Sequence, residues 1–286
     1  MKPSQFQHHA PEQIDEVVGL LAEYGDDAKV LAGGQSLIPM MALRMAAYPH
    51  LVDIARVASL STISASAGAV RVGAMVRQSR AERDASVAKV PLLAKAIPHI
   101  GHFQIRSRGT VGGSIAHADP ASELPAVALA LDARIEATGP GGVRHIDASE
   151  FFLSTWQTAL DDGEILSAVE FPLWGANSGF AVEEIARRKG DFALIGALAG
   201  VTLDGARVAR ACITMIGVGS TPIRCHDAEA ALIAGGADTD LDDIGRIAAA
   251  PLTPADDVHA SAEYRQHVSP AIVRRALTAA LKEARS

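Results

Sequence analysis

Hydrophobic residues near the N-terminus change their spacing several times within the first 54 positions. Between residues 11 and 24 they recur every three or four positions, which predicts a helix. A short apolar run over residues 29–32 is typical of a buried strand, and it stops at two consecutive glycines. A further helix is predicted over residues 37–47 and a further strand over residues 50–54. This region is therefore predicted to form one helix followed by a strand–turn–helix–strand unit.

The middle of the chain alternates hydrophobic and polar residues in short stretches, as hairpins do. One hairpin is predicted over residues 61–76, and a second from residues 133–138 and 143–146. Helical spacing predicts helices over residues 77–87, 92–100 and 122–130. Proline, glycine and asparagine then interrupt the pattern, so residues 171–178 are the best candidate for a domain boundary.

Beyond this boundary the pattern predicts two adjacent strands and then several helices. Long apolar runs over residues 192–203 and 208–218 are expected to be neighbouring strands. The helices are predicted over residues 228–233, 241–249, 255–267 and 270–284. For the last helix, Ser269 is the expected N-cap and Pro270 the expected first residue, because the first turn does not need the N–H that proline lacks.

Composition limits the classes of function. The chain has 286 residues, enough for one large domain or two ordinary ones, and its net charge is −7. That charge argues against a nucleic-acid partner or an anionic membrane, and an aromatic content of 4% argues against stacking on bases. No apolar run is long enough to cross a bilayer, and the N-terminus lacks the apolar segment of a signal peptide. We therefore expect a cytoplasmic protein without transmembrane helices.

The two cysteines, Cys212 and Cys225, exclude further classes. An iron–sulfur cluster needs four ligands, and a disulfide framework needs several pairs, so neither fits this chain. We expect two reduced, structural thiols in a reducing compartment.

The first candidate motif is Ala32-Gly33-Gly34-Gln35-Ser36, placed where a strand is predicted to lead into a helix. Glycines there allow positive φ and remove the Cβ atoms that would block a ligand. Consecutive backbone N–H groups in such a turn can form an anion-binding nest, and Ser36 could donate a further hydrogen bond. The alternative is a tight turn with no ligand.

The second candidate motif is Thr110-Val111-Gly112-Gly113-Ser114, followed closely by His117 and Asp119. The same physical argument applies, and so does the same structural alternative. Two such turns, each ending in serine, could face the two phosphates of one pyrophosphate.

Other chemical motifs are missing from the sequence. It contains no G-x-G-x-x-G, no P-loop, no G-x-S-x-G elbow and no visible nucleophile–base pair, and its histidines lack partners at metal-ligand spacing. Arg187-Arg188-Lys189 precedes Gly190-Asp191-Phe192 and forms a basic cluster beside a turn. This cluster is either a solvated face or a group of cations near a cofactor, with Phe192 free to face a ring.

Taken in order, these residues resemble a known family. Residues 32–41 (AGGQSLIPMM) and 104–114 (QIRSRGTVGGS) are similar to the FAD-binding medium subunit of the molybdenum hydroxylases. That family includes the flavoprotein subunit of aerobic carbon monoxide dehydrogenase and the flavin domain of xanthine dehydrogenase. The likeness extends over nearly the whole chain, through residues 119–120, 164–166, 187–193, 217–224 and 261–265.

The resemblance implies an α+β fold with two domains. Residues 1–175 would form an FAD-binding domain of the vanillyl-alcohol-oxidase (PCMH) type with two α/β subdomains. Residues 176–286 would form a smaller α+β domain like the C-terminal domain of the carbon monoxide dehydrogenase flavoprotein. FAD would be the cofactor on this chain.

The resemblance also implies roles for particular residues. The two glycine-rich turns would hold the FAD pyrophosphate, Asp119 would hydrogen-bond to the cofactor, and Leu166 would pack near the adenine. Asp191 and Phe192 would lie near the isoalloxazine, where the carbon monoxide dehydrogenase branch has a tyrosine at the position of Phe192. The implied FAD contacts are Ala32, Gly33, Gly34, Gln35, Ser36, Leu37, Thr110, Val111, Gly112, Gly113, Ser114, Ile115, His117, Asp119, Leu166, Lys189, Asp191 and Phe192. No catalytic or metal-binding residue is implied on this chain.

The implied function is electron transfer in a heterotrimeric molybdenum hydroxylase, assembled as a dimer of heterotrimers. A large subunit with a molybdenum–pterin cofactor would oxidise the substrate, and two [2Fe–2S] clusters on a small subunit would carry the electrons. FAD on this chain would pass them to a terminal acceptor. The substrate would be chosen on the large subunit, so carbon monoxide, purines and N-heteroaromatics all stay open.

Two other functions stay open at this point. A stand-alone flavin-dependent oxidoreductase of the same fold would need its own substrate base and cleft. A non-enzymatic nucleotide-binding or assembly module would use the glycine-rich turns only as structure. Flavin binding and turnover by the isolated chain distinguish the three.

Overall fold

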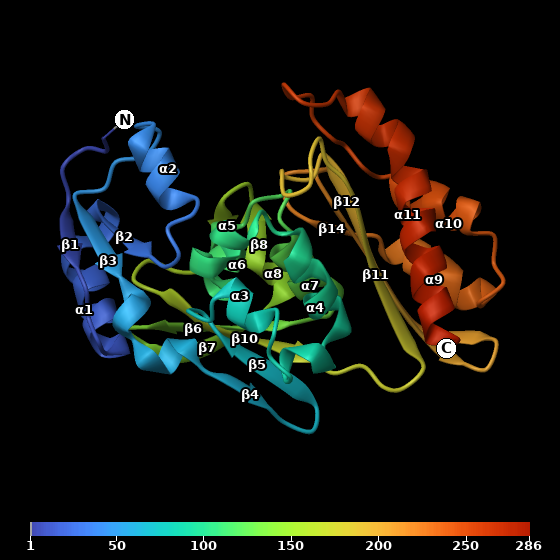
Figure 1. The fold of residues 1–286 in the computed structure, drawn as a ribbon, viewed down its shortest axis with the longest axis horizontal. Coiled ribbons are helices and arrows are strands. Elements are labelled where there is room, and N and C mark those ends of the chain that lie inside the picture. The colour runs from blue at the N-terminus through green and yellow to red at the C-terminus, as the bar shows by residue number, and fades with distance from the viewer. Residues whose placement is uncertain (1) are drawn as a thin grey trace.

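Three main sheets lie in a row across the molecule, each with its own helices (Figure 1). The computed structural model describes residues 2–286. The N-terminal part lies at one end, the C-terminal part at the other, and the remaining sheet with its helices lies between them (Figure 1). The mixture of helices with parallel and antiparallel strands confirms the predicted α+β class.

The first part is a parallel sheet packed against one long helix. It contains β1 (Gln7–His9), α1 (Ile14–Tyr24), η1 (Gly25–Asp27), β2 (Ala28–Leu31), α2 (Leu37–Ala42), β3 (His50–Asp53) and η2 (Ile54–Arg56). The strands lie in the order β1–β3–β2, and α1 buries Val17 and Leu21 against them. The predicted helix over residues 11–24 begins later, because the Glu16 carboxylate accepts the N–H groups of the two residues before the helix. α2 is shorter than predicted, because Arg44 has a φ of 59°, which ends a right-handed helix.

The middle part is an antiparallel sheet in the order β4–β5–β10–β6–β7. Its elements are η3 (Ala58–Ser61), β4 (Ile63–Ala65), β5 (Ala69–Gly73), α3 (Gln78–Ala81), η4 (Val87–Lys89), α4 (Pro91–Ala96), η5 (Ile97–His99), α5 (Phe103–Arg108), α6 (Val111–His117), α7 (Glu123–Ala130), β6 (Arg134–Gly139), β7 (Gly142–Asp147), α8 (Ala148–Phe151), β8 (Phe152–Ser154), β9 (Gln157–Thr158) and β10 (Ile165–Pro172). Both predicted hairpins are confirmed as β4–β5 and β6–β7.

Three predictions for this part are wrong in detail. The helix predicted over residues 77–87 is only the four-residue α3, because the Asp84 carboxylate accepts the N–H of Ser86 and turns the chain. The helix α5 was not predicted. Because α5 ends at Arg108 and α6 begins at Val111, the turn expected over residues 109–114 is shorter and joins two helices. The central strand β10 was also missed, because nearly all its residues are buried and no polar alternation marks it.

The third part is an antiparallel sheet with helices packed on it. It contains β11 (Ser178–Ile185), β12 (Ile195–Asp204), β13 (Arg207–Ile216), β14 (Ile223–Arg224), α9 (His226–Gly235), α10 (Leu241–Ala249) and α11 (Ala262–Ala284). The strands lie in the order β11–β12–β13–β14. The predicted pair of adjacent strands is confirmed as β12 and β13, whereas β11 was missed.

The prediction of two helices at the C-terminus is wrong, because α11 is continuous through Pro270. Ser261 is its N-cap and accepts the N–H of Tyr264 at 3.1 Å, while Ser269 donates its hydroxyl to the carbonyl of Arg265 at 2.7 Å. Before Pro270 the helix packs Val268 against the core of the third part and buries Arg265 and Ser269, and after Pro270 it buries a series of apolar residues in the same core. This shared burial outweighs the one backbone hydrogen bond that proline removes.

Ion pairs join the middle part to the third part. Asp132 accepts hydrogen bonds from Arg210 at 3.0 Å and from Arg224. Lys95 pairs with Glu283 at 2.9 Å, and the other oxygen of Glu283 accepts the backbone N–H of Phe180 at 2.7 Å. These contacts fix the third sheet against the helices of the middle part.

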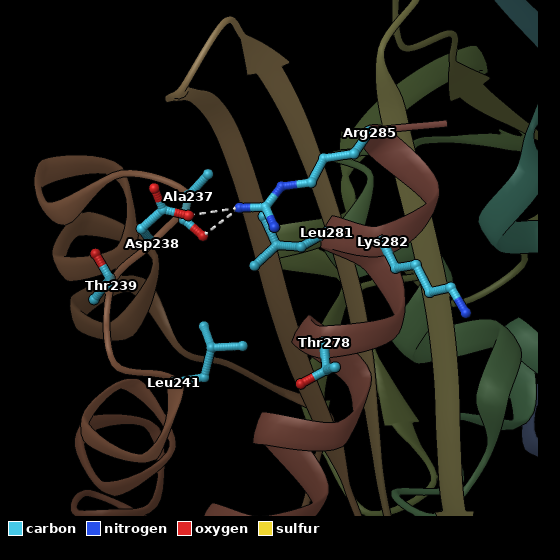
Figure 2. A pocket seen from close by; sticks show the side chains of 8 residues that line it. All are labelled: Ala237, Asp238, Thr239, Leu241, Thr278, Leu281, Lys282 and Arg285. Atoms are coloured by element: carbon cyan, nitrogen blue, oxygen red, sulfur yellow. Dashed lines mark hydrogen bonds and ion pairs between the residues drawn. The ribbon is translucent and has the colours of Figure 1, made fainter.

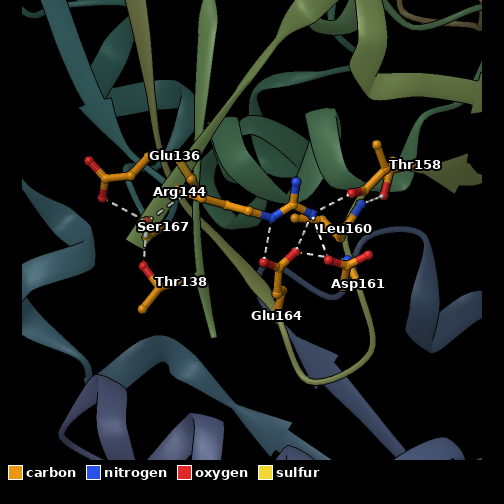
Figure 3. Close-up of polar contacts among 9 residues, drawn as sticks. Glu136, Thr138, Arg144, Thr158, Leu160, Asp161, Glu164 and Ser167 are labelled. Atoms are coloured by element: carbon orange, nitrogen blue, oxygen red, sulfur yellow. Dashed lines mark hydrogen bonds and ion pairs between the residues drawn. The ribbon is translucent and has the colours of Figure 1, made fainter. Parts of the chain in front are cut away.

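Arg144 on β7 holds the turn that leads into β10 (Figure 3). Its guanidinium donates to Glu164 at 2.7 Å and to Asp161 at 3.1 Å. The hydrogen bond from Arg144 lowers the pKa of Glu164 below its ordinary value. The turn therefore enters β10 in a fixed position.

Ser167 marks a bulge in β10 and lies between two polar neighbours on β6 (Figure 3). Its hydroxyl donates to Glu136 at 2.7 Å and accepts from Thr138 at 2.9 Å. Its carbonyl accepts the N–H of Ala74 at 2.9 Å. The bulge thus ties β10 to the end of β5, from which the candidate site is built.

We predict that Gly245→Ala destabilises the fold. A Cβ at Gly245 on α10 would lie 2.4 Å from the carbonyl oxygen of Pro270 on α11. The two helices would have to separate, and we expect the free energy of unfolding to fall by about 2 kcal/mol. Urea unfolding followed by circular dichroism measures the change.

Gly19→Ala on α1 is the matched control for this variant. Within residues 2–286 no atom lies within 4 Å of a Cβ built at Gly19. Alanine should therefore stabilise the exposed helix by up to about 1 kcal/mol. Equal effects of the two variants would contradict the proposed contact between α10 and α11.

Candidate functional site

The two glycine-rich segments, residues 32–37 and 110–115, touch one another although they lie far apart in the sequence. A Cβ at Gly33 would lie 2.5 Å from the carbonyl oxygen of Arg108 and 2.8 Å from the Cα of Gly109. A Cβ at Gly113 would lie 3.2 Å from the Cβ of Ala32. Any side chain at Gly33 would separate the segments, so glycine is required for this backbone-to-backbone approach.

The first segment carries unpaired hydrogen-bond donors. Within residues 2–286, the backbone N–H groups of residues 33–36 have no protein acceptor. The side-chain amide of Gln35 donates to the carbonyl of Gly33 at 3.1 Å and braces the turn, and Gly34 has a φ of 73°. These residues are only half-buried. The segment therefore presents consecutive donors toward an open site, as an anion-binding nest does.

The second segment differs from the first, because its first N–H groups have protein acceptors. Val111 donates to the carbonyl of Val76 and Gly112 to that of Ala74, both at 3.0 Å. Gly113 donates to the Thr110 hydroxyl at 3.0 Å. The first backbone N–H groups of this segment are therefore not free for a ligand. What the segment offers instead is a backbone that another group can approach closely. Its remaining donor is Ser114, whose hydroxyl, like that of Ser36, has no protein partner within residues 2–286.

Residues that precede the second segment hold it in place. Arg77 donates its guanidinium to the carbonyl of Arg108, and the Gln78 backbone N–H donates to Gly109 at 2.9 Å. The pKa of Arg77 is lowered mainly because the side chain is partly buried, and secondly because of the positive charge of Arg108. Sequence reasoning missed both residues, because they make main-chain contacts that no motif signals.

His117, the last residue of α6, and Asp119, which follows the helix, contact Trp156, which sequence reasoning also missed. The rings of His117 and Trp156 stack with centroids 5.9 Å apart. The indole N–H of Trp156 donates to the Asp119 carboxylate at 3.3 Å, and the other carboxylate oxygen accepts the N–H of Ala121 at 2.9 Å. Burial lowers the pKa of His117 and so favours its neutral form. No spacing pattern in the sequence links Trp156 to these residues.

Several of the predicted contact residues lie deeper in the fold. Leu166 on β10 is 4% exposed and belongs to the hydrophobic core of the middle part. Val111 and Ile115 on α6 belong to the same core, while Leu37 starts α2 and is half-buried. Leu166 is adjacent to Ser167, whose carbonyl is bonded to Ala74 beside Gly112. Leu166, Val111 and Ile115 therefore pack in the core next to the second glycine-rich segment, whereas Leu37 lies outside that core.

The loop with Lys189, Asp191 and Phe192 lies at the other end of α5 from Gly33. A Cβ at Gly190 would lie 2.7 Å from Nδ1 of His102, the residue before α5, whereas Gly33 contacts Arg108 at its C-terminal end. A six-residue helix is roughly 9 Å long. The structure thus brings the two glycine-rich segments together and keeps this loop about one short helix away.

The side chains of this loop are largely accessible. Phe192 is 65% exposed and Lys189 is exposed, whereas Asp191 is half-buried and lies 3.5 Å from the Arg187 guanidinium. Phe103 on the adjacent α5 is 67% exposed. Two exposed phenylalanines therefore lie on neighbouring elements, and exposed large apolar side chains are common at binding surfaces.

A group of titratable residues lies behind this loop. His99 Nδ1 is 3.1 Å from Glu184, and both line a cavity of about 480 Å³ together with residues 186–191. The hydrogen bond to Glu184 raises the pKa of His99. Glu123 at the start of α7 is buried, and burial together with the charge of Glu184 raises its pKa to about 8. Glu123 is therefore largely protonated at neutral pH.

Other chemistry-bearing side chains do not assemble into sites. Cys212 and Cys225 are buried, and burial raises the pKa of each thiol to about 12, so both are unreactive. Among residues 2–286, no group of three or more histidine, cysteine, aspartate or glutamate side chains could hold a metal ion. In the same range, every helix is too short or too polar to cross a membrane.

Comparison with known proteins agrees with this architecture. The family model described as "FAD binding domain in molybdopterin dehydrogenase" matches residues 4–174. A second model, described as "CO dehydrogenase flavoprotein C-terminal domain", matches residues 180–280.

Full-length relatives support the same assignment. The 6-hydroxypseudooxynicotine dehydrogenase complex subunit alpha of Paenarthrobacter nicotinovorans is 41% identical, over 100% of this chain and 97% of that protein. The carbon monoxide dehydrogenase medium chain of Hydrogenophaga pseudoflava is 36% identical over 98% of both chains. A solved structure of carbon monoxide dehydrogenase from that organism, lacking the Mo-pyranopterin moiety, superposes with a TM-score of 0.95 at 38% identity and 99% coverage of both chains.

This chain therefore belongs to the family of FAD-binding subunits of molybdopterin dehydrogenases. The predicted family, its FAD-binding fold and its oxidoreductase class are confirmed.

We predict that Glu123→Gln stabilises the chain at high pH and has little effect at low pH. The unfolded chain releases this proton near the ordinary glutamate pKa of 4.5, whereas burial raises the pKa in the folded chain to about 8. The folded state binds the proton more tightly, so Glu123 lowers the free energy of unfolding as pH rises through this window. Because one pKa unit corresponds to about 1.4 kcal/mol, we expect a gain of about 2–4 kcal/mol at about pH 8.5 and almost none at about pH 4.5.

Chemical unfolding at the two pH values measures this difference. Glu263→Gln is the matched control, because Glu263 lies in the first turn of α11 as Glu123 does in α7, but is exposed. We expect no comparable gain from the control at high pH. A Glu123→Gln variant with the same stability change at both pH values would contradict the protonated state of Glu123.

Proposed function

We propose that this chain binds FAD and is the electron-transfer subunit of a heterotrimeric molybdenum hydroxylase. The main support for this proposal is the contact between the two glycine-rich segments. The backbone N–H groups of residues 33–36 at this contact have no protein acceptor within residues 2–286. Family membership supports FAD as the cofactor, and this local geometry supports a pyrophosphate site at the contact.

The residues at this contact fit a dinucleotide. The amides of residues 33–36 and the hydroxyls of Ser36 and Ser114 are unpaired donors, which suit the oxygens of a pyrophosphate. A Cβ at Gly33 or Gly113 would fill the space in which the segments meet, so the backbone can come close to a ligand there. Thr110 supports the site indirectly by capping Gly113.

The remaining predicted residues fit the two ends of such a cofactor. Asp119, held by Ala121 and by the Trp156 indole, would accept a hydrogen bond from the cofactor, with His117 beside it. Phe192 and Asp191 would contact the isoalloxazine, and Lys189 would supply positive charge near it. Leu166 would act indirectly, by packing in the core next to the second glycine-rich segment.

When FAD is bound, it can accept and release electrons one or two at a time. The residues of this chain would bind it, orient its ring toward the surface near Phe192, and exclude water from its pyrophosphate. Electrons would come from two [2Fe–2S] clusters on a small subunit, supplied by a molybdenum–pterin centre on a large subunit, and would leave to a terminal acceptor. The relatives support assembly into a complex, since one is named as a complex subunit and another as a medium chain.

Further features of the proposal concern organisation. We propose that the chain divides near residue 175 into an FAD-binding domain and a smaller C-terminal domain, that it works in the cytoplasm, and that heterotrimers pair into dimers. The names of the relatives refer to 6-hydroxypseudooxynicotine and to carbon monoxide. Such variety supports the view that the substrate is selected by a partner subunit rather than by this chain.

We predict that Gly33→Ala abolishes FAD binding. The added Cβ would lie 2.5 Å from the Arg108 carbonyl, so the two segments must separate and the donors of residues 33–36 would be displaced. We expect FAD content below about one tenth of the wild-type level, a loss of at least about 1.4 kcal/mol of binding free energy. Visible absorbance of the purified chain, after incubation with FAD, measures it.

Gly68→Ala is the control for this experiment. Gly68 lies in the turn between β4 and β5, and within residues 2–286 no atom lies within 4 Å of its added Cβ. The control should bind FAD normally, and circular dichroism should show that both variants fold. A folded Gly33→Ala chain with a full FAD content would rule out the proposed pyrophosphate site.

We also predict that flavin reduction depends on the partner subunits. The isolated chain with FAD should remain oxidised in the presence of an oxidisable substrate, such as carbon monoxide or an N-heteroaromatic compound. Addition of the small and large subunits that co-purify with it should allow reduction by the substrate of that complex. Anaerobic spectroscopy follows the reaction, and reduction by the isolated chain would instead favour a stand-alone oxidoreductase.

A further inference from the structure

Arg265 on α11 is a buried cation that reaches out of its own helix. Its side chain is only 8% exposed. One terminal nitrogen donates to the carbonyl of Leu194 at 2.7 Å and to that of Gly217 at 2.9 Å. The other donates to the carboxylate of Asp257. Arg265 therefore joins the start of α11 to two loops at the end of the third sheet.

The two carbonyls lie at the ends of neighbouring strands. Leu194 immediately precedes β12, and Gly217 immediately follows β13. These two strands are hydrogen-bonded neighbours in the third sheet. Gly217 has a φ of 72°, and a Cβ there would lie 2.5 Å from the Leu194 carbonyl oxygen. The two carbonyl dipoles point at one guanidinium, which offsets their mutual repulsion and satisfies both acceptors.

Each of these carbonyls belongs to a segment that leads to the proposed flavin site. Leu194 is two residues after Phe192, and its N–H donates to Ile185 at 2.8 Å, which closes the loop over residues 186–193. The N–H of Gly217 donates to the carbonyl of Pro120 at 3.0 Å. Pro120 is next to Asp119, so this single side chain is tied both to the loop with Phe192 and to the segment with Asp119.

We propose that Arg265 is a positioning residue for the flavin, which it influences by fixing the loop with Asp191 and Phe192 relative to Asp119. This inference rests on the proposed binding of FAD. Arg265 does not touch the cofactor. It acts through the Leu194 and Gly217 carbonyls, so its loss should alter the affinity and the reduction potential of the flavin and not only the stability of the chain.

The role requires the shape of arginine and not only its charge. The guanidinium is a planar fork that serves two carbonyls and a carboxylate at once, whereas lysine offers one compact ammonium group on a flexible stem. Asp257 orients the fork from the far side. Burial raises the pKa of Asp257, but the N–H groups of His259 and Ala260 and the charge of Arg265 outweigh this, so its pKa is lowered.

The same helix offers a matched control at its other end, Arg285 (Figure 2). Its guanidinium donates to the carbonyl of Ala237 at 3.0 Å and to the carboxylate of Asp238 at 2.8 Å. This contact has the same chemistry as that of Arg265 but is half-exposed and joins α11 to the turn after α9. A change there tests the loss of an arginine–carbonyl clamp on α11 away from the proposed flavin site.

The experiment compares Arg265→Lys, Asp257→Asn and Arg285→Lys in the full chain reconstituted with FAD. Three quantities are measured: the dissociation constant for FAD, the midpoint potential of the bound flavin, and its visible circular dichroism. For Arg265→Lys we expect a dissociation constant raised about tenfold, a displaced potential and an altered dichroism spectrum. Asp257→Asn should change all three in the same direction by less, and Arg285→Lys should change none.

The outcomes separate this inference from the proposed function. If the wild-type chain binds no FAD, the proposed function itself fails. If it binds FAD and both Arg265→Lys and Asp257→Asn keep wild-type values for all three quantities, only the positioning role is overturned. Far-ultraviolet circular dichroism checks folding, and if Arg265→Lys does not fold, the exposed Asp257→Asn substitution decides alone.

Discussion

The candidate site depends on one close approach, that of Gly33 to the backbone at Arg108 and Gly109. Segments from two different parts of the fold meet there with no side chain between them, which only glycine allows. The approach is supported on both sides, by Gln35 within the first segment and by Arg77 and Gln78 behind the second. A side chain at Gly33 would separate the segments and move the unpaired donors of residues 33–36 away from Ser114.

The sequence predicted this centre better than it predicted its surroundings. A glycine pair after an apolar run carries a local signal, because the conformations that glycine allows are a property of the residue itself. Trp156, Arg77 and Arg265 carry no such signal, since each acts on a carbonyl or carboxylate that is distant in the sequence. Such contacts depend on the tertiary fold, which hydrophobic spacing does not encode.

The errors in secondary structure have related physical causes. Periodicity finds a strand with one solvated face, and so found the two hairpins, but it misses β10, which is buried on both faces. Pro270 was expected to start a helix because proline suits a first turn. It lies within α11 instead, because the helix packs against one core on both sides of Pro270. Tertiary burial outweighed a local preference in both cases.

The two glycine-rich segments look alike in sequence but contribute different things. The second uses its amides on Val76, Ala74 and Thr110, which anchors α6 to the end of β5. The first leaves its amides unpaired, at the expense of its own local stability. A ligand that pairs those amides would therefore stabilise the first segment far more than the second. If FAD binds here, we expect it to stabilise residues 32–37 more than α6, so FAD affinity and the local stability of the first segment should be thermodynamically linked.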